Sequence, residues 1–375
     1  MINPVIFGVV GGGWRAEFYF RIAQAMPERF QIAGCVARTE ATRARIKAAW
    51  KIRIFGELDA LLDQHPHFVV ASVPWAASPP VLIELAARDM PTLAETPPAP
   101  DLEGLIRLWK DLPKKARVQV AEQYQFQPLH AARLAFVRSE KLGEVRQVQI
   151  SAAHGYHGVS LIRKFLHAGH ENATIRAFKF KSPLIAGPSR TGPPSAETKV
   201  ESVQVIAYLQ FDHKLAVFDF ATDQYWSWIR SQRLLVRGER GEINNLDASY
   251  LTDFRTPANV RFERHDAGQT GNLEGYYHKG YSAGGIWCYQ NPFVPARLCD
   301  DEIAIATCLE RMAHYVETGE SFYGLSEASQ DHYLSMLIAE AAETGKELKS
   351  SNQIWRSEDD PHRGHKGQKR GHKGI

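Results

Sequence analysis

The chain has 375 residues, which exceeds one typical domain, so two domains are the first expectation. Its 44% apolar and 23% charged residues are ordinary for a globular protein, and no apolar run is long enough to predict a membrane span. The formal net charge of +3 comes from the last twenty residues, which carry six basic and three acidic side chains, so the neutral remainder lacks the basic footprint of a nucleic-acid-binding protein.

The four cysteines form no Cys-x-x-Cys pair and therefore give neither a disulfide framework nor a zinc signature. They are Cys35, Cys288, Cys299 and Cys308. We expect no metal site and a reducing, cytoplasmic location. The first apolar stretch lacks a preceding basic segment, so it reads as a strand rather than as a signal peptide.

Residues 1–121 alternate between short apolar runs and amphipathic stretches, the pattern of a parallel sheet with helices between its strands. The expected strands are residues 5–10, 31–37, 53–55, 68–73, 91–95 and 118–121. The expected helices are residues 17–25, 40–50, 58–64, 79–88 and 102–112. We therefore predict an α/β domain over residues 1–121.

A glycine motif lies between the first strand and the first helix. Residues 11–16 (Gly-Gly-Gly-Trp-Arg-Ala) fit G-x-G-x-x-A in the strand–turn–helix context of a Rossmann dinucleotide-binding site. Gly11 would permit the tight turn, Gly13 would let a pyrophosphate approach the backbone, and Ala16 would let helix and strand pack closely. The helix N-terminus would add free N–H groups. The alternative is a glycine-rich turn of another α/β protein, and the flanking pattern favours the dinucleotide site.

Longer, alternating strands follow residue 121 and predict an α+β domain over residues 122–355 with an open, mostly antiparallel sheet. The expected strands are residues 145–151, 174–182, 201–211, 215–222 and 233–237. The expected helices are residues 129–139, 300–318 and 325–345, and residues 272–295 read as a long loop. Residues 356–375 repeat Arg-Gly-His-Lys-Gly twice and predict a disordered basic tail.

Several segments, in this order and spacing, are similar to those of one enzyme family. They are the glycine turn, 93–97 (Leu-Ala-Glu-Thr-Pro), 123–128 (Gln-Tyr-Gln-Phe-Gln-Pro), 142–145, 238–242 and 345–348. Over residues 5–349 the chain resembles the glucose–fructose oxidoreductase / inositol dehydrogenase (Gfo/Idh/MocA) family. The resemblance implies a Rossmann domain, an α+β domain whose open sheet commonly forms an oligomer interface, and NAD(P)-dependent chemistry on a sugar, glycoside or polyol.

The resemblance also indicates where catalytic groups would lie. Typical members use the Lys of a Glu-Lys-Pro signature and a downstream Asp-x-x-x-His. Here Thr96 stands at the Lys position, Ala153 at the Asp position and His157 at the His position. His157 is therefore the expected general acid/base, since imidazole titrates near neutral pH. The alternative is a structural histidine that caps a helix beginning near Val159.

Neighbouring side chains could compensate for the two altered positions. His154 and Tyr156 flank His157 and could replace the missing Asp, whereas the Thr96 hydroxyl could bond a ribose or the substrate. Asp223, Tyr225, Trp226 and Trp228 could bind a sugar through aromatic faces and a carboxylate, or form an oligomer interface.

The end of the second strand bears on cofactor choice. NAD-selective sites place an acid there for the ribose hydroxyls, but this chain has Arg38 and Thr39. That pair favours NADP(H) over NAD(H), unless Arg38 is simply solvated in a site that accepts either cofactor. Further cofactor contacts are expected from Gly11, Gly13, Trp14, Arg15, Pro74, Trp75, Glu95 and Gln123. Burial between the two domains is the alternative explanation for Trp75.

The first functional hypothesis is an NAD(P)-dependent oxidoreductase that acts on a secondary hydroxyl or ketone of a carbohydrate-like small molecule and forms a homo-oligomer. The altered Lys and Asp positions leave two alternatives open. One is a nucleotide-binding sensor or inactive relative, and the other is a lyase or glycosidase that retains its cofactor and oxidises the substrate transiently.

Overall fold

The computed structural model describes residues 4–268 and 275–356, and the chain divides into two compact units. The described part of the first unit comprises residues 4–122, Ile305–Ser329 and residues 354–356. The second unit comprises Gln123–Ala304 and Gln330–Gln353. The sequence predicts an unbroken second domain over residues 122–355, and the structure differs because Ile305–Ser329 cluster with the first unit. The predicted tail lies outside the described residues from 357 onward.

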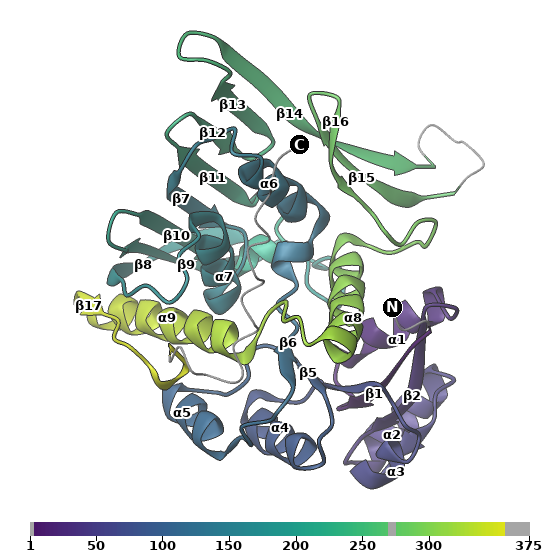
Figure 1. Ribbon diagram of the computed structural model, residues 1–375. Helices are drawn as coiled ribbons and strands as arrows, with labels where there is room; N and C mark the ends of the chain where they lie inside the picture. Colours follow the sequence, from purple (N-terminus) through teal and green to yellow (C-terminus); the bar gives the residue numbers. More distant parts are fainter. Residues whose placement is uncertain (1–3, 269–274, 357–375) are drawn as a thin grey trace, which may run out of the picture. The chain divides into compact units, whose positions relative to one another are not determined.

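The first unit contains a six-stranded parallel sheet in the order β3-β2-β1-β4-β5-β6. Its strands are β1 (Val5–Val10), β2 (Phe30–Val36), β3 (Ile54–Phe55), β4 (Phe68–Ala71), β5 (Thr92–Ala94) and β6 (Val118–Val120). Its helices are α1 (Ala16–Ala25), α2 (Glu40–Ala49), α3 (Leu58–Leu62), α4 (Ser78–Ala87) and α5 (Leu102–Asp111), which flank the sheet (Figure 1). This strand order is that of a Rossmann fold, and such sheets bind ligands at the carboxyl ends of their strands.

Local sequence signals explain several of these elements. The Thr39 side chain accepts a hydrogen bond from the backbone N–H of Thr42 and so caps α2, and Asp101 caps α5 in the same way. Strand β4 is buried along its whole length, as expected for a central parallel strand. None of the described helices combines the length and apolar character that crossing a bilayer requires.

Backbone pairing explains why part of the C-terminal region belongs to the first unit. The Val120 N–H, in edge strand β6, donates to the carbonyl oxygen of Tyr323 at 2.8 Å. Tyr323, Leu325 and Ala328 also pack into the core of the first unit. Composition and periodicity carry no information about such long-range packing, so the expected boundary missed it.

The second unit is built on an eleven-stranded sheet in the order β16-β15-β14-β13-β12-β11-β7-β10-β9-β8-β17. Neighbouring strands are antiparallel except β7 and β10, which pair in parallel. The strands are β7 (Val145–Ser151), β8 (Thr174–Ile185), β9 (Lys199–Gln210), β10 (Leu215–Ala221), β11 (Arg233–Gly238), β12 (Gly241–Asn244), β13 (Asp247–Leu251), β14 (Pro257–Ala267), β15 (Tyr277–Ala283), β16 (Ile286–Gln290) and β17 (Leu348–Lys349).

Helices cover one face of this sheet and leave the other open. Apolar residues of α6 (Pro128–Arg138), α7 (Gly155–Leu166) and the C-terminal part of α9 (Leu325–Thr344) share one core with the strands (Figure 1). Along β8 and β9 the opposite face carries Phe178, Phe180 and Tyr208, each about half-exposed. The predicted α+β fold with an open, mostly antiparallel sheet is therefore confirmed. The remaining long helix, α8 (Asp300–Thr318), begins in the second unit and continues in the first.

The prediction of a long loop over residues 272–295 is wrong for the described part of that segment. Strands β15 and β16 form an antiparallel hairpin there, joined by Gly284 and Gly285 with φ of +58° and +79°. Two left-handed residues in a two-residue turn suit the twist of a hairpin, and aromatic residues such as Tyr281 and Tyr289 favour strands. The Gly-Gly pair was the overlooked signal. Strands β12, β13 and β14 were not expected either.

Candidate functional site

The glycine turn after β1 has three positions with different surroundings. Gly11 has a φ of +111°, and a Cβ there would lie 1.9 Å from the carbonyl oxygen of Ser72, so only glycine fits. A Cβ at Gly12 would lie 2.6 Å from side-chain carbons of Thr42 and Ile46 in α2. At Gly13, by contrast, nothing lies within 4 Å of the Cβ position. The Cβ position of Gly13 therefore faces open space.

Arg15 is held beside this turn by a buried carboxylate. Its Nε donates to Oε1 of Glu95 at 2.9 Å, and the Tyr19 hydroxyl donates to the same oxygen at 2.5 Å. Tyr19 is fully buried, and burial together with the nearby Glu95 carboxylate raises the pKa of Tyr19 well above its ordinary value. Glu95 thus accepts hydrogen bonds from Arg15, at the N-terminus of α1, and from Tyr19, within that helix. The sequence offered no signal for Tyr19, which reads as an ordinary core residue of a helix.

The connection after β2 carries positive charge. Arg38 and Thr39 are exposed, and the Thr39 hydroxyl also donates to that of Thr42 at 2.7 Å. The nearest acid, Glu40, accepts a hydrogen bond from Nη2 of Arg43 at 2.7 Å. Arg43 also donates to the carbonyl oxygens of residues 37 and 38, at 2.9 Å each. Because Glu40 is engaged with Arg43, the connection presents guanidinium groups rather than a free carboxylate.

Arg45 of α2 reaches the glycine turn. It donates to the Gly12 carbonyl oxygen and pairs with Oε1 of Glu17 at 2.5 Å. The sequence reasoning missed Arg43 and Arg45. Their position in the first two turns of the helix after β2 was the available signal, since that helix flanks the turn in a Rossmann fold.

Two tryptophans follow the carboxyl ends of β1 and β4, which are neighbouring strands. Trp14 is 51% exposed and Trp75 is 48% exposed. Pro74 precedes the short 3-10 helix Trp75–Ala77. Thr96, next to Glu95 and before Pro97, is partly exposed. The structure therefore places every expected first-unit site residue just beyond the carboxyl ends of β1, β2, β4 and β5.

In the second unit, the segment after β7 builds a cluster of aromatic and imidazole rings. His157 lies in the first turn of α7, which begins at Gly155 rather than near Val159, and its ring is buried. The ring centroid of His157 is 4.5 Å from that of Tyr124, 4.5 Å from that of Tyr156 and 5.0 Å from that of His154. The expected acid/base is thus inside the helix and packed against other rings, not a cap.

His154 has a different environment from His157. Its Nδ1 lies 2.7 Å from the Tyr225 hydroxyl oxygen, which also accepts a hydrogen bond from the His154 backbone N–H at 3.0 Å. The Tyr124 hydroxyl donates to the same oxygen at 3.2 Å. Burial and, to a smaller extent, the neighbouring His157 lower the pKa of His154 to about 4. His154 is therefore neutral near pH 7.

Two buried acceptors near this cluster lack protein partners. Oε1 of Gln123 and Oγ of Ser160 have no hydrogen bond within the described residues, although both atoms are buried. Buried polar atoms are nearly always satisfied, by protein, water or ligand. Gln123 directly precedes Tyr124 and was expected to contact the cofactor, so its unsatisfied oxygen fits a ligand donor such as a hydroxyl or carboxamide.

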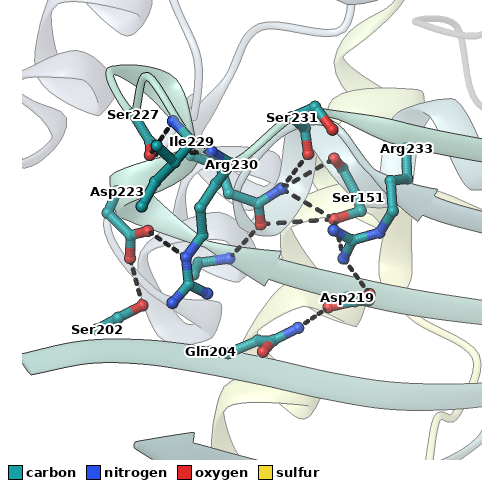
Figure 2. Close-up of polar contacts among 12 residues, drawn as sticks. Ser151, Ser202, Gln204, Asp219, Asp223, Ser227, Ile229, Arg230, Ser231 and Arg233 are labelled. Atoms are coloured by element: carbon teal, nitrogen blue, oxygen red, sulfur yellow. Dashed lines mark hydrogen bonds and ion pairs between the residues drawn. The ribbon is translucent and has the colours of Figure 1, made fainter. Parts of the chain in front are cut away.

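The residues after β10 form a polar network (Figure 2). Oδ1 of Asp223 accepts a hydrogen bond from Ser202 at 2.6 Å, and its Oδ2 lies 3.8 Å from Nε of Arg230. Asp223 is thus bonded to protein groups, and Tyr225 belongs to the His154 cluster. Trp226 and Trp228 remain 41% and 71% exposed. The four residues expected to act together therefore divide between different environments.

Comparisons with known proteins agree with this architecture. Residues 5–124 match the GFO_IDH_MocA profile, described as an oxidoreductase family with an NAD-binding Rossmann fold. The match covers the part of the chain that carries the parallel sheet and its glycine turn. No curated protein matches the sequence.

Solved structures of the same fold cover nearly the whole chain. A myo-inositol dehydrogenase from Corynebacterium glutamicum is 16% identical, with 93% of this chain and 99% of that chain covered at a TM-score of 0.61. Levoglucosan dehydrogenase in complex with NADH and levoglucosan is 13% identical, with 93% and 100% covered and a TM-score of 0.64. GenD2 from gentamicin A biosynthesis, in complex with NAD, is 17% identical, with 94% and 98% covered and a TM-score of 0.60.

Proposed function

We propose that this protein is an NAD(P)-dependent oxidoreductase that moves a hydride between the nicotinamide and a secondary hydroxyl or ketone of a sugar, glycoside or polyol. The observation that carries the proposal is the open space at the Cβ position of Gly13. Gly13 lies between Gly11, which tolerates no side chain, and the N-terminus of α1 beside Arg15. The family match of residues 5–124 supports the same cofactor class. The inositol and levoglucosan named for two structural neighbours support the substrate class.

The dinucleotide would be held by the residues beyond the carboxyl ends of the first-unit strands. The Gly11–Ala16 turn would bind the pyrophosphate through backbone N–H groups. Trp14, Pro74 and Trp75 would contact the nicotinamide half. Exposed Arg38, with Glu40 engaged by Arg43, favours the 2′-phosphate of NADP(H).

The cofactor preference is tested by fluorescence titration of Arg38→Ala with NADPH and NADH. Loss of a charge-assisted phosphate contact is expected to weaken NADPH about tenfold or more and to leave NADH unchanged. The matched control is Arg107→Ala, which removes an exposed guanidinium from α5. Tighter binding of NADH than of NADPH by the unaltered protein would overturn the NADP(H) preference.

Proton transfer would fall to the second-unit cluster. When bound, the nicotinamide supplies the hydride acceptor or donor. His157 takes the proton of the substrate hydroxyl during oxidation and returns it during reduction, because imidazole exchanges protons near neutral pH. Tyr156 packs on the His157 ring and orients it. The Thr96 hydroxyl donates to, or accepts from, a ribose or substrate oxygen.

A second candidate function is a nucleotide-binding protein without turnover. It is favoured by Thr96 and by fully buried Ala153, which stand where typical relatives use Lys and Asp. Neither side chain can transfer a proton or stabilise an imidazolium.

A panel of polyols, sugars, glycosides and ketoses, followed by nicotinamide absorbance, separates the two candidates. The oxidoreductase proposal expects turnover of at least one compound and a loss of about 100-fold or more in His157→Ala. His213→Ala, at an exposed turn, is the matched control and should retain activity. NADPH binding with no turnover of any compound would instead support the second candidate.

We also propose that a second copy of the chain packs on the open face of the eleven-stranded sheet. Phe178, Phe180 and Tyr208 expose aromatic surface on adjacent strands of that face. Aromatic side chains are enriched in the cores of protein interfaces, which supports a homo-oligomer.

A further inference from the structure

The Tyr225 hydroxyl lies at the centre of a hydrogen-bond set that joins three distant segments of the second unit. His154 follows β7, Tyr124 lies in the 3-10 helix Tyr124–Phe126, and Tyr225 ends the 3-10 helix after β10. The Tyr225 oxygen accepts from the His154 backbone N–H and from the Tyr124 hydroxyl. A phenol oxygen has two acceptor sites and one proton to donate. Both acceptor sites are therefore used.

This count fixes the direction of the remaining bond. His154 Nδ1 lies 2.7 Å from the Tyr225 oxygen, and with both acceptor sites filled, Tyr225 must donate its own proton to Nδ1. An imidazole that accepts at Nδ1 and is neutral carries its proton on Nε2. Within residues 4–268 and 275–356, His154 Nε2 has no hydrogen-bond partner, and the ring is only partly buried. Nε2–H is a donor available to a ligand.

We propose that Tyr225 is a positioning residue that fixes His154 in the Nε2–H form, and that His154 donates this hydrogen bond to an oxygen of the substrate. The proposal rests on the oxidoreductase function proposed above. The proposal changes the expected role of His154. Typical relatives have an Asp where this chain has Ala153, and a carboxylate accepts hydrogen bonds, so an Nε2–H donor cannot replace it. His157 remains the proton-transferring group, and His154 orients or polarises the oxygen that reacts.

The surrounding titratable groups are consistent with this division. Tyr124 packs from one 3-10 helix, Tyr225 from another, and Tyr156 and His157 from α7, while His332 of α9 contacts the Tyr156 ring. Burial and the nearness of His157 hold the pKa of His154 at about 4. At neutral pH the second imidazole therefore stays uncharged and acts as a donor without competing for the proton.

The first test is ¹⁵N NMR of histidine-labelled protein without cofactor or substrate, with His154 assigned from a His154→Gln sample. We expect a bare Nδ1 and a protonated Nε2 that persist from pH 7 to pH 5. In Tyr225→Phe the hydroxyl that fixes the Nε2–H tautomer is absent, so the Nδ1–H tautomer of His154 should become populated. Tyr250→Phe is the matched control, since Tyr250 also packs partly buried on the same core, and it should leave the His154 signals unchanged. A protonated Nδ1 in the unaltered protein would overturn the proposal.

The second test concerns the substrate contact. A Gln amide can occupy the place of Nε2 and an Asn amide the place of Nδ1, so His154→Gln should keep most of kcat/KM, whereas His154→Asn should lose about tenfold or more. Tyr225→Phe should fall in kcat/KM to a similar extent, and its loss should go together with the change of His154 tautomer seen by NMR. Equal activity of the Gln and Asn variants would refute substrate donation. If no compound is turned over at all, the oxidoreductase function fails, and the NMR result still decides the role of Tyr225.

Discussion

Replacing Gly13 by alanine separates cofactor binding from folding at the glycine turn. The Cβ position of Gly13 has no atom within 4 Å, and its φ lies outside the left-handed region. The folded state therefore accepts the new methyl group, and the unfolded chain loses conformational freedom. We expect the free energy of unfolding to stay the same or to rise by up to about 1 kcal/mol.

The same methyl group should interfere with the cofactor. It would occupy the open space through which a pyrophosphate reaches the backbone N–H groups of the turn. Hydrogen bonds to a charged group contribute roughly 1.5–3 kcal/mol each, and every 1.4 kcal/mol is about tenfold in affinity. Loss of one such bond therefore predicts a Kd for NADPH that is about 10- to 100-fold weaker in Gly13→Ala.

Gly11→Ala should show the opposite pattern. Its Cβ would lie 1.9 Å from the Ser72 carbonyl oxygen, and its φ of +111° is strained for any side chain. Overpacking and left-handed strain together cost about 3 kcal/mol or more, so this variant loses stability first. The control is Gly169→Ala in the second unit, whose Cβ position is also open.

Urea unfolding followed by tryptophan fluorescence, combined with titration of NADPH, measures both quantities on the same samples. The reasoning requires Gly13→Ala to be stable and weak in binding, and Gly169→Ala to match the unaltered protein in both. It would be refuted if Gly13→Ala bound NADPH as tightly as the unaltered protein does.

Three further changes test the fold and the assembly. Burial lowers the pKa of His130 to about 3. Between pH 6.5 and 3 the histidine is protonated in the unfolded chain but neutral in the folded protein, so the free energy of unfolding falls as the pH drops through this range. His130→Asn, which keeps an acceptor for Arg133, should lose about 2 kcal/mol less between pH 7 and pH 5 in urea unfolding, and equal losses would contradict this origin. Asp331→Asn removes the charge from a 2.5 Å ion pair with Arg163, in which each side chain is 3% exposed. It should lower the free energy of unfolding by about 3–5 kcal/mol, and an unchanged unfolding midpoint would contradict this prediction. Phe178→Asp places a charge on the open sheet face and should lower the mass of the oligomer measured by sedimentation. An unchanged mass would contradict an interface on this face.

Short-range patterns predicted most of the first unit. The strand–turn–helix context of Gly11 and the buried run of β4 are local in sequence, and the parallel sheet follows from their alternation. The pairing of Arg15 with Glu95 joins residues 80 positions apart, so the presence of both could be predicted but not their contact. Tyr19, buried in a helix, gave no polar signal at all.

The second unit was harder to predict because some of its strands lack a clear buried face. β14 exposes every second residue along most of its length and reads as a polar stretch, and it becomes a strand only through its partners β13 and β15. The Tyr225–His154 bond spans 71 positions, and sequence alone assigned Tyr225 to sugar stacking or to an interface. Function depends here on tertiary contacts, which residue types and spacing do not report.

The most direct measurement is the fate of the hydrogen on the reacting carbon. A polyol or sugar found to react would be deuterated at its secondary carbinol carbon and incubated with NADP⁺, and the nicotinamide and product would be analysed by mass spectrometry. Net hydride transfer predicts one deuterium in the reduced nicotinamide for each ketone formed, with the yield falling in His157→Ala. Product formation with unlabelled, unconsumed cofactor, or deuterium returned to the product, would contradict it.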